Sequence, residues 1–197
     1  FYVGSEVTIG TNLVSFLSDP LTVNLQESVA GKLLAFYWGG AMIGRFLGSV
    51  ALSDSKALKK LILMVLISIA LTAFLVYSIG NVELKLVYYV AFQALAIILL
   101  LACKSSARMN LVLFSLVNIA NLVVAMMMAN TMFAAWAILS IGIFNSVMWP
   151  NIFDLGIANL GKYKEQGSSL LVMMILGGAL LPLVQGYIAD IGNIVDS

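Results

Sequence analysis

The sequence predicts an all-α fold, a polytopic bundle of about seven membrane-spanning helices. Three observations predict it. Hydrophobic residues make up 62% of the 197 residues and charged residues only 10%, whereas soluble domains are about 45–50% apolar and about a quarter charged. The apolar residues form separate stretches of about 20 residues, the length at which a helix crosses a bilayer. These stretches lack the alternation of apolar and polar residues that marks a membrane β-barrel.

Each predicted span ends at charged or turn-forming residues, which are costly in lipid and interrupt helices. The separators are 19–20, 54–56, 81–83, 104–106, 130–131 and 161–164. The separator at 130–131 carries no charge, so this boundary has the weakest signal. In chain order the predicted spans are 1–17, 33–53, 61–79, 86–103, 109–129, 132–157 and 168–189.

The basic residues divide unevenly between alternate connections. One set of connections holds seven Lys and Arg residues, and the opposite set holds two. Cytoplasmic loops are enriched in Lys and Arg, so the sequence predicts that the first set faces the cytoplasm. The seven are Lys56, Lys59, Lys60, Lys104, Arg108, Lys162 and Lys164, and the two are Lys32 and Lys85.

Several classes of chemistry are excluded by composition. The sequence has no His and a single Cys, which excludes His-based metal sites, catalytic triads with His, and CxxC redox centres. A net charge of +1 provides no basic surface for nucleic acid. We therefore expect no catalytic residues, no metal and no cofactor, and the protein is predicted not to be an enzyme.

Three glycines at intervals of four form a smooth stripe on the second span. They are Gly40, Gly44 and Gly48, and such a stripe lets another helix approach closely. One interpretation is a sliding surface that moves during function, and the alternative is static packing. The last span repeats the spacing at 177–186, around Pro182. One interpretation is an inverted repeat, and the alternative is a chance similarity of small residues.

Arg45 lies near the predicted middle of the second span, roughly 18 Å from its outer end at 1.5 Å per residue. A buried Arg at this depth costs at least about 2.5 kcal/mol and needs a partner or water. Glu6, at similar depth on the antiparallel first span, is the natural partner. Asp154, toward the cytoplasmic end of the sixth span, is the alternative. Snorkelling of Arg45 to the cytoplasmic surface would remove the need for either.

The sixth span combines Asn145 with Trp149 and Pro150. An amide and a flat indole are suited to a sugar, since one binds hydroxyls and the other stacks on the ring. The alternative is that Trp149 anchors the helix at the interface while Asn145 binds a neighbouring helix. Pro150 frees a backbone carbonyl and can bend the helix. Further amides without an evident role are Asn12, Asn118, Asn121 and Gln185.

The sequence resembles the fucose permease and glucose/galactose transporter family of the major facilitator superfamily. Residues 1–10 (FYVGSEVTIG) are similar to that family's seventh helix, and residues 36–49 (FYWGGAMIGRFLGS) to its eighth. Residues 144–153 (FNSVMWPNIF) are similar to the tenth helix, and residues 167–186 to the eleventh.

The resemblance implies that residues 1–197 form part of a C-terminal transporter half, with helices equivalent to 7–11. The N-terminal half and a twelfth helix would lie outside this sequence, together with the family's proton-coupling carboxylates. The pair of spans at 61–103 has no counterpart in the short-form pattern and is expected to be inserted. The family's cavity-lining role falls here on Glu6, Asn12, Asn145 and Trp149.

The function that the resemblance implies is hexose transport, glucose- or galactose-like, by alternating access with proton symport. The expected partners are a sugar, protons, the lipid bilayer and the missing N-terminal half. The expected location is the inner membrane of a bacterium. A membrane sensor or scaffold that descends from a transporter but transports nothing is the alternative function.

Overall fold

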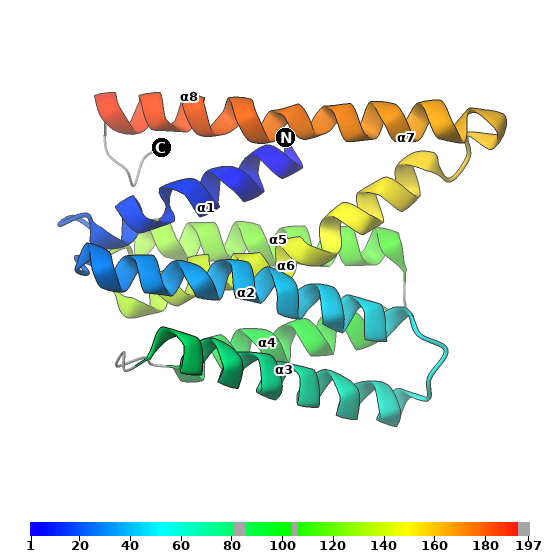
Figure 1. Cartoon of the computed structure of the whole chain (residues 1–197), viewed down its shortest axis with the longest axis horizontal. Coiled ribbons are helices and arrows are strands. Elements are labelled where there is room, and N and C mark those ends of the chain that lie inside the picture. The colour runs from blue at the N-terminus through cyan, green and yellow to red at the C-terminus, as the bar shows by residue number, and fades with distance from the viewer. Residues whose placement is uncertain (81–85, 104–105, 193–197) are drawn as a thin grey trace.

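The computed structural model describes residues 1–80, 86–103 and 106–192, and this part of the chain is helical without strands. A 3₁₀ turn over residues 174–176 links the last two helices, and another over residues 161–163 precedes them, so that residues 161–191 form one continuous rod. The helices are α1 (Tyr2–Ser18), α2 (Glu27–Leu52), α3 (Ala57–Ile79), α4 (Leu86–Ala102), α5 (Ala107–Met127), α6 (Met132–Ile157), η1 (Gly161–Tyr163), α7 (Lys164–Met173), η2 (Met174–Leu176) and α8 (Gly177–Ile191) (Figure 1).

The all-α membrane bundle predicted from the sequence is confirmed. Among the described residues, five helices are long and apolar enough to cross a membrane: α2, α3, α5, α6 and the rod of α7 and α8. The apolar helix α4 and the helix α1 have 17 residues each, which is about 25 Å at 1.5 Å per residue and the lower limit for a span. Figure 1 shows the beginning of α1 near the middle of the bundle's length.

Two helices begin six or seven residues earlier than the sequence predicts. The helix α2 begins at Glu27 and not at residue 33, and the last span begins at Gly161 and not at residue 168. Both early turns are polar, so an apolar pattern misses them. The carboxylate of Glu27 stands in the first turn of α2, where the positive end of the helix dipole stabilises it.

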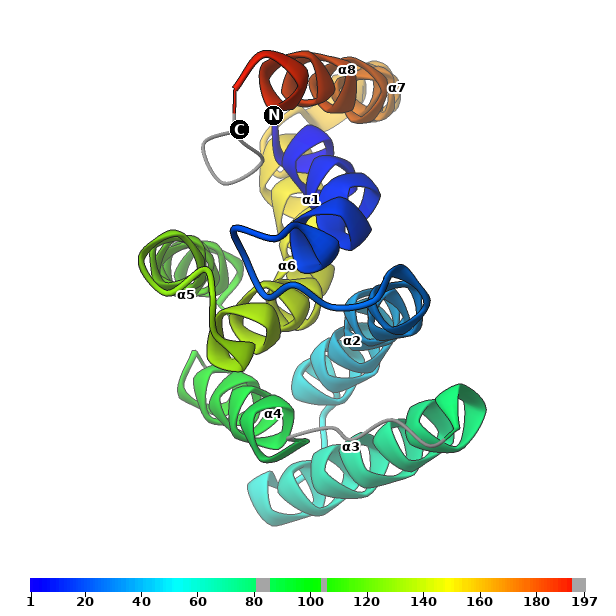
Figure 2. The same cartoon turned by 90° about the vertical axis from the view of Figure 1, so that its left-hand side faces the viewer.

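The helix α6 lies at the centre of the bundle. Its residues from 134 to 147 are all buried, and Figure 2 shows α1, α2, α4 and α5 arranged around it. The rod of α7 and α8 lies at one side against α1, and α3 lies at the opposite side against α2 and α4. The interior of the bundle is therefore built on α6.

Small residues bring α2 and α6 into close contact. A side chain at Gly44 would collide with the Ser146 hydroxyl and the Ile143 carbonyl, and one at Gly142 would collide with the Tyr37 carbonyl. Gly40 also faces Ile143, and Gly48 faces Val147. The glycine stripe of α2 thus packs on a helix of the same bundle, which agrees with the static interpretation of the stripe.

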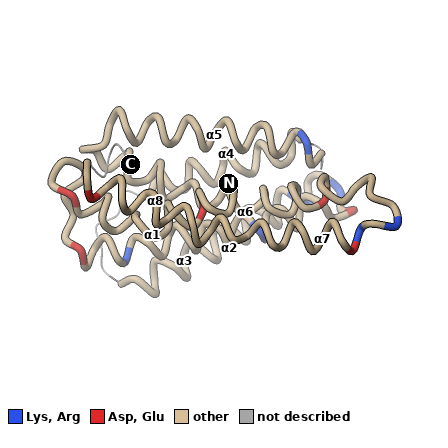
Figure 3. The backbone as a smooth tube through the Cα atoms, turned by 90° about the horizontal axis from the view of Figure 1, so that it is seen from above, with Lys and Arg blue, Asp and Glu red and all other residues tan. Residues whose placement is uncertain are grey.

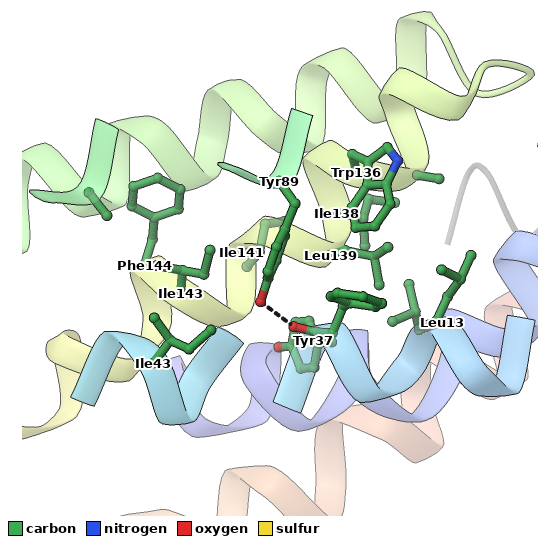
Figure 4. Close-up of a cluster of buried hydrophobic side chains, with 14 of the residues drawn as sticks. Leu13, Tyr37, Ile43, Tyr89, Trp136, Ile138, Leu139, Ile141, Ile143 and Phe144 are labelled. Atoms are coloured by element: carbon green, nitrogen blue, oxygen red, sulfur yellow. Dashed lines mark hydrogen bonds between the residues drawn. The ribbon is translucent and has the colours of Figure 1, made fainter. Parts of the chain in front are cut away.

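An aromatic cluster joins α4 to this helix pair. The ring of Phe36 packs edge-on against Tyr89 and Trp136, with centroids 5.1 and 5.3 Å apart. The Tyr89 hydroxyl donates a hydrogen bond of 3.0 Å to the Phe36 carbonyl (Figure 4). A second polar link, from Gln93 to the Thr72 hydroxyl at 2.7 Å, connects α4 to α3. The pair α3 and α4 is in this way attached to the core.

The basic residues gather at one end of the bundle. Figure 3 shows most Lys and Arg positions at the end that carries the turn between α6 and α7, and mainly Asp and Glu at the other end. The connections α2–α3 and α6–α7 lie at the basic end, and α1–α2 and α5–α6 at the acidic end (Figure 1). Lys85 and Lys104 lie outside the described residues. This arrangement has the asymmetry on which the predicted orientation depends.

We expect Gly44→Ala to destabilise the protein by about 1–3 kcal/mol, the usual cost of overpacking a tight core. The added methyl would push α2 away from Ser146. Thermal unfolding of the detergent-solubilised full-length protein measures the effect. Gly31→Ala is the matched control in the same helix, since nothing lies within 4 Å of that position. Equal unfolding temperatures for the two variants would contradict the close contact.

Candidate functional site

The first turns of α1 lie against the middle of α6 through Tyr2. Its hydroxyl donates a hydrogen bond of 2.5 Å to the backbone carbonyl of Asn145. Its ring stacks on Trp149, with centroids 6.3 Å apart and planes at 15°. Trp149 is half-buried and also lies 6.5 Å from the Phe153 ring. Tyr2 therefore connects the two residues of α6 for which the sequence predicts a role.

The side chain of Asn145 is buried and held from both sides. It is 5% exposed, and its Oδ1 accepts a hydrogen bond of 2.7 Å from Asn118 Nδ2 on α5. It also lies close to the Tyr37 hydroxyl on α2. A bond to a neighbouring helix is one of the two interpretations that the sequence allows for Asn145. In this conformation a substrate reaches the Asn145 amide only if a neighbouring side chain moves.

Glu6 is half-buried on the face of α1 that also carries Tyr2. The hydroxyl of Tyr37 donates a hydrogen bond of 2.8 Å to the Glu6 backbone carbonyl. Arg45 acts electrostatically on the Glu6 carboxylate, although its own side chain is exposed on α2. An Arg at this depth needs water or protein around it. The structure thus places the two charges predicted to pair on the same side of the bundle.

Asp154 lies further along the bundle than Glu6. It is exposed and lines a shallow hollow with Trp149, Pro150 and the end of α2 at Leu52. Leu52 is seven residues after Arg45, which is roughly 10 Å along the helix at 1.5 Å per residue. The end of α2 beside Asp154 is thus about two helical turns beyond Arg45.

A separate cavity of about 480 Å³ opens between α1, α5, α6 and α8. Its polar wall holds Asn12, whose Nδ2 donates a hydrogen bond of 2.6 Å to Gln185 Oε1. The Thr8 hydroxyl, on the same wall, is buried without a hydrogen-bond partner. Neither Asn145 nor Trp149 lines this cavity. The predicted site residues thus occupy two places, and Asn12 stands apart from the others.

The two prolines lie inside helices. Pro150 is exposed in α6, and Pro182 is half-buried in α8. Neither can donate to the carbonyl four residues earlier, which is Ser146 in α6 and Gly178 in α8. In α8 the affected turn packs on α1, since Gly178 faces Val3 and Val7.

Sequence reasoning missed the two tyrosines at the centre of this arrangement. Tyr2 stands four residues before Glu6, so both lie on one face of a helix, and this spacing was an available signal. Tyr37 had no comparable signal, because an aromatic residue within an apolar span is ordinary. The roles of Asn118 and Gln185 were equally invisible, since each depends on a partner 27 or 173 residues away.

Replacing one member of the Asn12–Gln185 pair should cost more stability than replacing both. Asn12→Leu leaves the Gln185 amide without its partner, at about 1–3 kcal/mol. In the double variant Asn12→Leu with Gln185→Leu, no amide remains to be satisfied, so the two effects should not add. Thermal unfolding of the full-length wild type, the two single variants and the double variant measures the stability changes in this double-mutant cycle. Strictly additive losses would show that the two amides do not depend on each other.

Comparisons with known proteins give a consistent set of relatives. The chain is 35% identical over 192 residues to a glucose/galactose transporter of Brucella abortus biovar 1 (strain 9-941), covering 96% of this chain and 34% of that relative. It is 32% identical over 197 residues to a putative glucose/galactose transporter of Helicobacter pylori (strain ATCC 700392 / 26695), covering all of this chain and 35% of that relative. Over 52 residues it is 48% identical to an L-fucose-proton symporter of Escherichia coli (strain K12), covering 26% of this chain and 12% of the symporter.

No family model matches the chain. The search of solved structures gives no significant match. The chain spans about a third of the length of the curated glucose/galactose transporters that it matches. These relatives are transporters and symporters and not enzymes. The resemblance to the fucose permease and glucose/galactose transporter family is confirmed by these relatives, and the apolar helices are those of a multi-pass membrane protein.

Proposed function

We propose that the full-length protein transports a hexose such as glucose or galactose across the inner membrane of a bacterium. The observation that carries the proposal is the 35% identity to a glucose/galactose transporter over 96% of this chain. In this proposal residues 1–197 supply helices equivalent to 7–11 of the C-terminal half. Residues 61–103, which include α4 and all but the first turn of α3, form an added pair on one side of the bundle. The remaining half of the protein supplies the opposite wall of the sugar site.

The polar groups near the middle of α1 and α6 support a sugar site there. Trp149 is half-buried beside Tyr2, and an indole face binds the C–H face of a sugar ring. Glu6 and Arg45 offer hydrogen bonds to hydroxyls on the same side of the bundle. Asn145 lies directly behind Tyr2 and joins the site when Tyr2 moves. Alternating access then exposes this site to each side of the membrane in turn.

Hexose uptake by cells that lack their own hexose transporters tests the proposal. Cells with the full-length protein should accumulate labelled glucose or galactose, and an uncoupler that dissipates the proton gradient should abolish the accumulation. Accumulation that resists the uncoupler would contradict proton symport. Binding of hexose to the purified protein without any uptake would favour the sensor and contradict transport.

Trp149→Ala should raise the KM for hexose uptake about tenfold, because a stacking face worth about 1–1.5 kcal/mol is lost. Tyr77→Ala is the control, since Tyr77 is 87% exposed on α3. Figure 2 shows α3 on the opposite side of α6 from α1. Initial uptake rates over a range of hexose concentrations give both KM values. An unchanged KM in Trp149→Ala would remove this residue from the sugar site.

Exchanging the two charges tests the Glu6–Arg45 pair. Glu6→Arg alone and Arg45→Glu alone should each reduce uptake more than tenfold, because each places two like charges close together at a depth where a lone charge costs at least about 2.5 kcal/mol. The double exchange restores opposite charges and should recover a substantial part of the uptake. If neither single variant is impaired at equal expression, the pair has no role in transport.

A further inference from the structure

Two tyrosine hydroxyls fasten α1 to its neighbours within a single helical turn. The hydroxyl of Tyr2, on α1, donates a hydrogen bond of 2.5 Å to the Asn145 carbonyl of α6. The hydroxyl of Tyr37, on α2, donates a hydrogen bond of 2.8 Å to the Glu6 carbonyl of α1. Tyr2 and Glu6 are four residues apart and share one face of α1. This face is therefore held at two points, against two different helices.

The Tyr37 contact belongs to a longer series of hydrogen-bonding groups. Asn118 of α5 donates to Asn145 of α6 at 2.7 Å, and the Asn145 side chain lies beside the Tyr37 hydroxyl. Tyr37 itself is fully buried on α2. The amide–tyrosine series, Asn118–Asn145–Tyr37–Glu6, thus passes through four helices and ends at the main chain of α1.

Apolar packing alone fixes the rotation of α1 weakly. Lipid is as apolar as the helix surfaces, so burying apolar residues between helices gains little, and close packing and hydrogen bonds decide the arrangement. One side of α1 leans on α8, whose residues are all at least partly exposed, and the contact there is made by glycines at positions 4 and 178. A hydrogen bond is directional and so supplies a rotational constraint that glycine contacts lack. The Asn12–Gln185 bond provides one toward α8, and the two tyrosine hydroxyls provide it toward α2 and α6 at the first turns of α1.

We propose that Tyr37 is a positioning residue, which sets the rotation and depth of α1 so that the Glu6 carboxylate faces the interior beside Arg45. It acts through the Glu6 main chain and touches no substrate. The role of Glu6 in sugar transport rests on the function proposed above, whereas the fastening of α1 by Tyr37 does not depend on it.

Tyr37→Phe removes only the hydroxyl and has a matched control in Tyr89→Phe. Tyr89 is also fully buried, and its hydroxyl also donates to a main-chain carbonyl, that of Phe36 at 3.0 Å. That bond joins α4 to α2 and does not involve α1. Each hydroxyl also lies close to one amide side chain, Asn145 for Tyr37 and Gln93 for Tyr89. The two variants therefore lose similar interactions, and a difference between them in the exchange of α1 reports on the bond to the Glu6 carbonyl.

Hydrogen–deuterium exchange of the purified full-length protein in lipid nanodiscs measures directly how firmly α1 is held in place. We expect peptides within residues 2–18 to exchange at least about threefold faster in Tyr37→Phe than in the wild type, and at the wild-type rate in Tyr89→Phe, because local opening follows the loss of local hydrogen bonds. Unchanged exchange of α1 in Tyr37→Phe overturns the proposal. Equal acceleration in both variants also overturns it, since it would indicate general loosening.

Hexose uptake tests the consequence for Glu6. Tyr37→Phe should raise KM about fivefold, the size of one lost hydrogen bond, and Tyr89→Phe should leave it unchanged. In the background of Glu6→Gln, Tyr37→Phe should have no further effect, because Tyr37 acts through Glu6. A full additional effect in that background overturns the positioning role. If the wild type takes up no hexose while α1 exchange still differs between the two tyrosine variants, the proposed function fails and the fastening of α1 stands.

Discussion

The close approach of α2 and α6 is the contact on which the rest of the bundle depends. It exists because Gly44 and Gly142 leave no side chain between the two backbones. With the axes this near, Tyr37 of α2 lies deep enough to meet Asn145 of α6 and still reach the main chain of α1. The aromatic contact of Phe36 with Trp136 and Tyr89 has the same origin, so the attachment of α4 also follows from the glycines.

The number and order of the spans could be predicted from the sequence, because the cost of charge in lipid marks the boundaries, except the uncharged one at 130–131. Their starting points were less certain, since a first turn that lies in the polar interface has no apolar signature. The turns at Glu27 and Gly161 are of this kind. The sequence also does not say which helix becomes central. The burial of α6 follows from the small residues 134, 135, 137 and 142 together with a partner glycine stripe on another helix.

The candidate site was predicted in part. Depth along a helix follows from counting residues, so Glu6 and Arg45 are predicted to lie at similar depth. Rotation about the helix axis could not be predicted, because apolar spans have little amphipathic pattern. For this reason Asn12, which has the right depth and residue type, turned out to face Gln185 and a different cavity. Tyr2 and Tyr37 became visible only once the neighbouring helices were placed.

Polar side chains therefore largely determine how these helices pair. The described helices differ widely in burial. In the most apolar 18-residue stretch of α6, 78% of the residues are buried, whereas no residue is buried in the corresponding stretch of the rod of α7 and α8. The polar contacts follow the same gradient, since the amide–tyrosine series is built on α6 while α8 contributes the single amide of Gln185. In lipid an unpaired amide or hydroxyl is costly wherever it lies, so such groups persist where a partner is fixed. The rigid centre of the bundle and its candidate site coincide because the contacts that hold the polar groups also hold the helices.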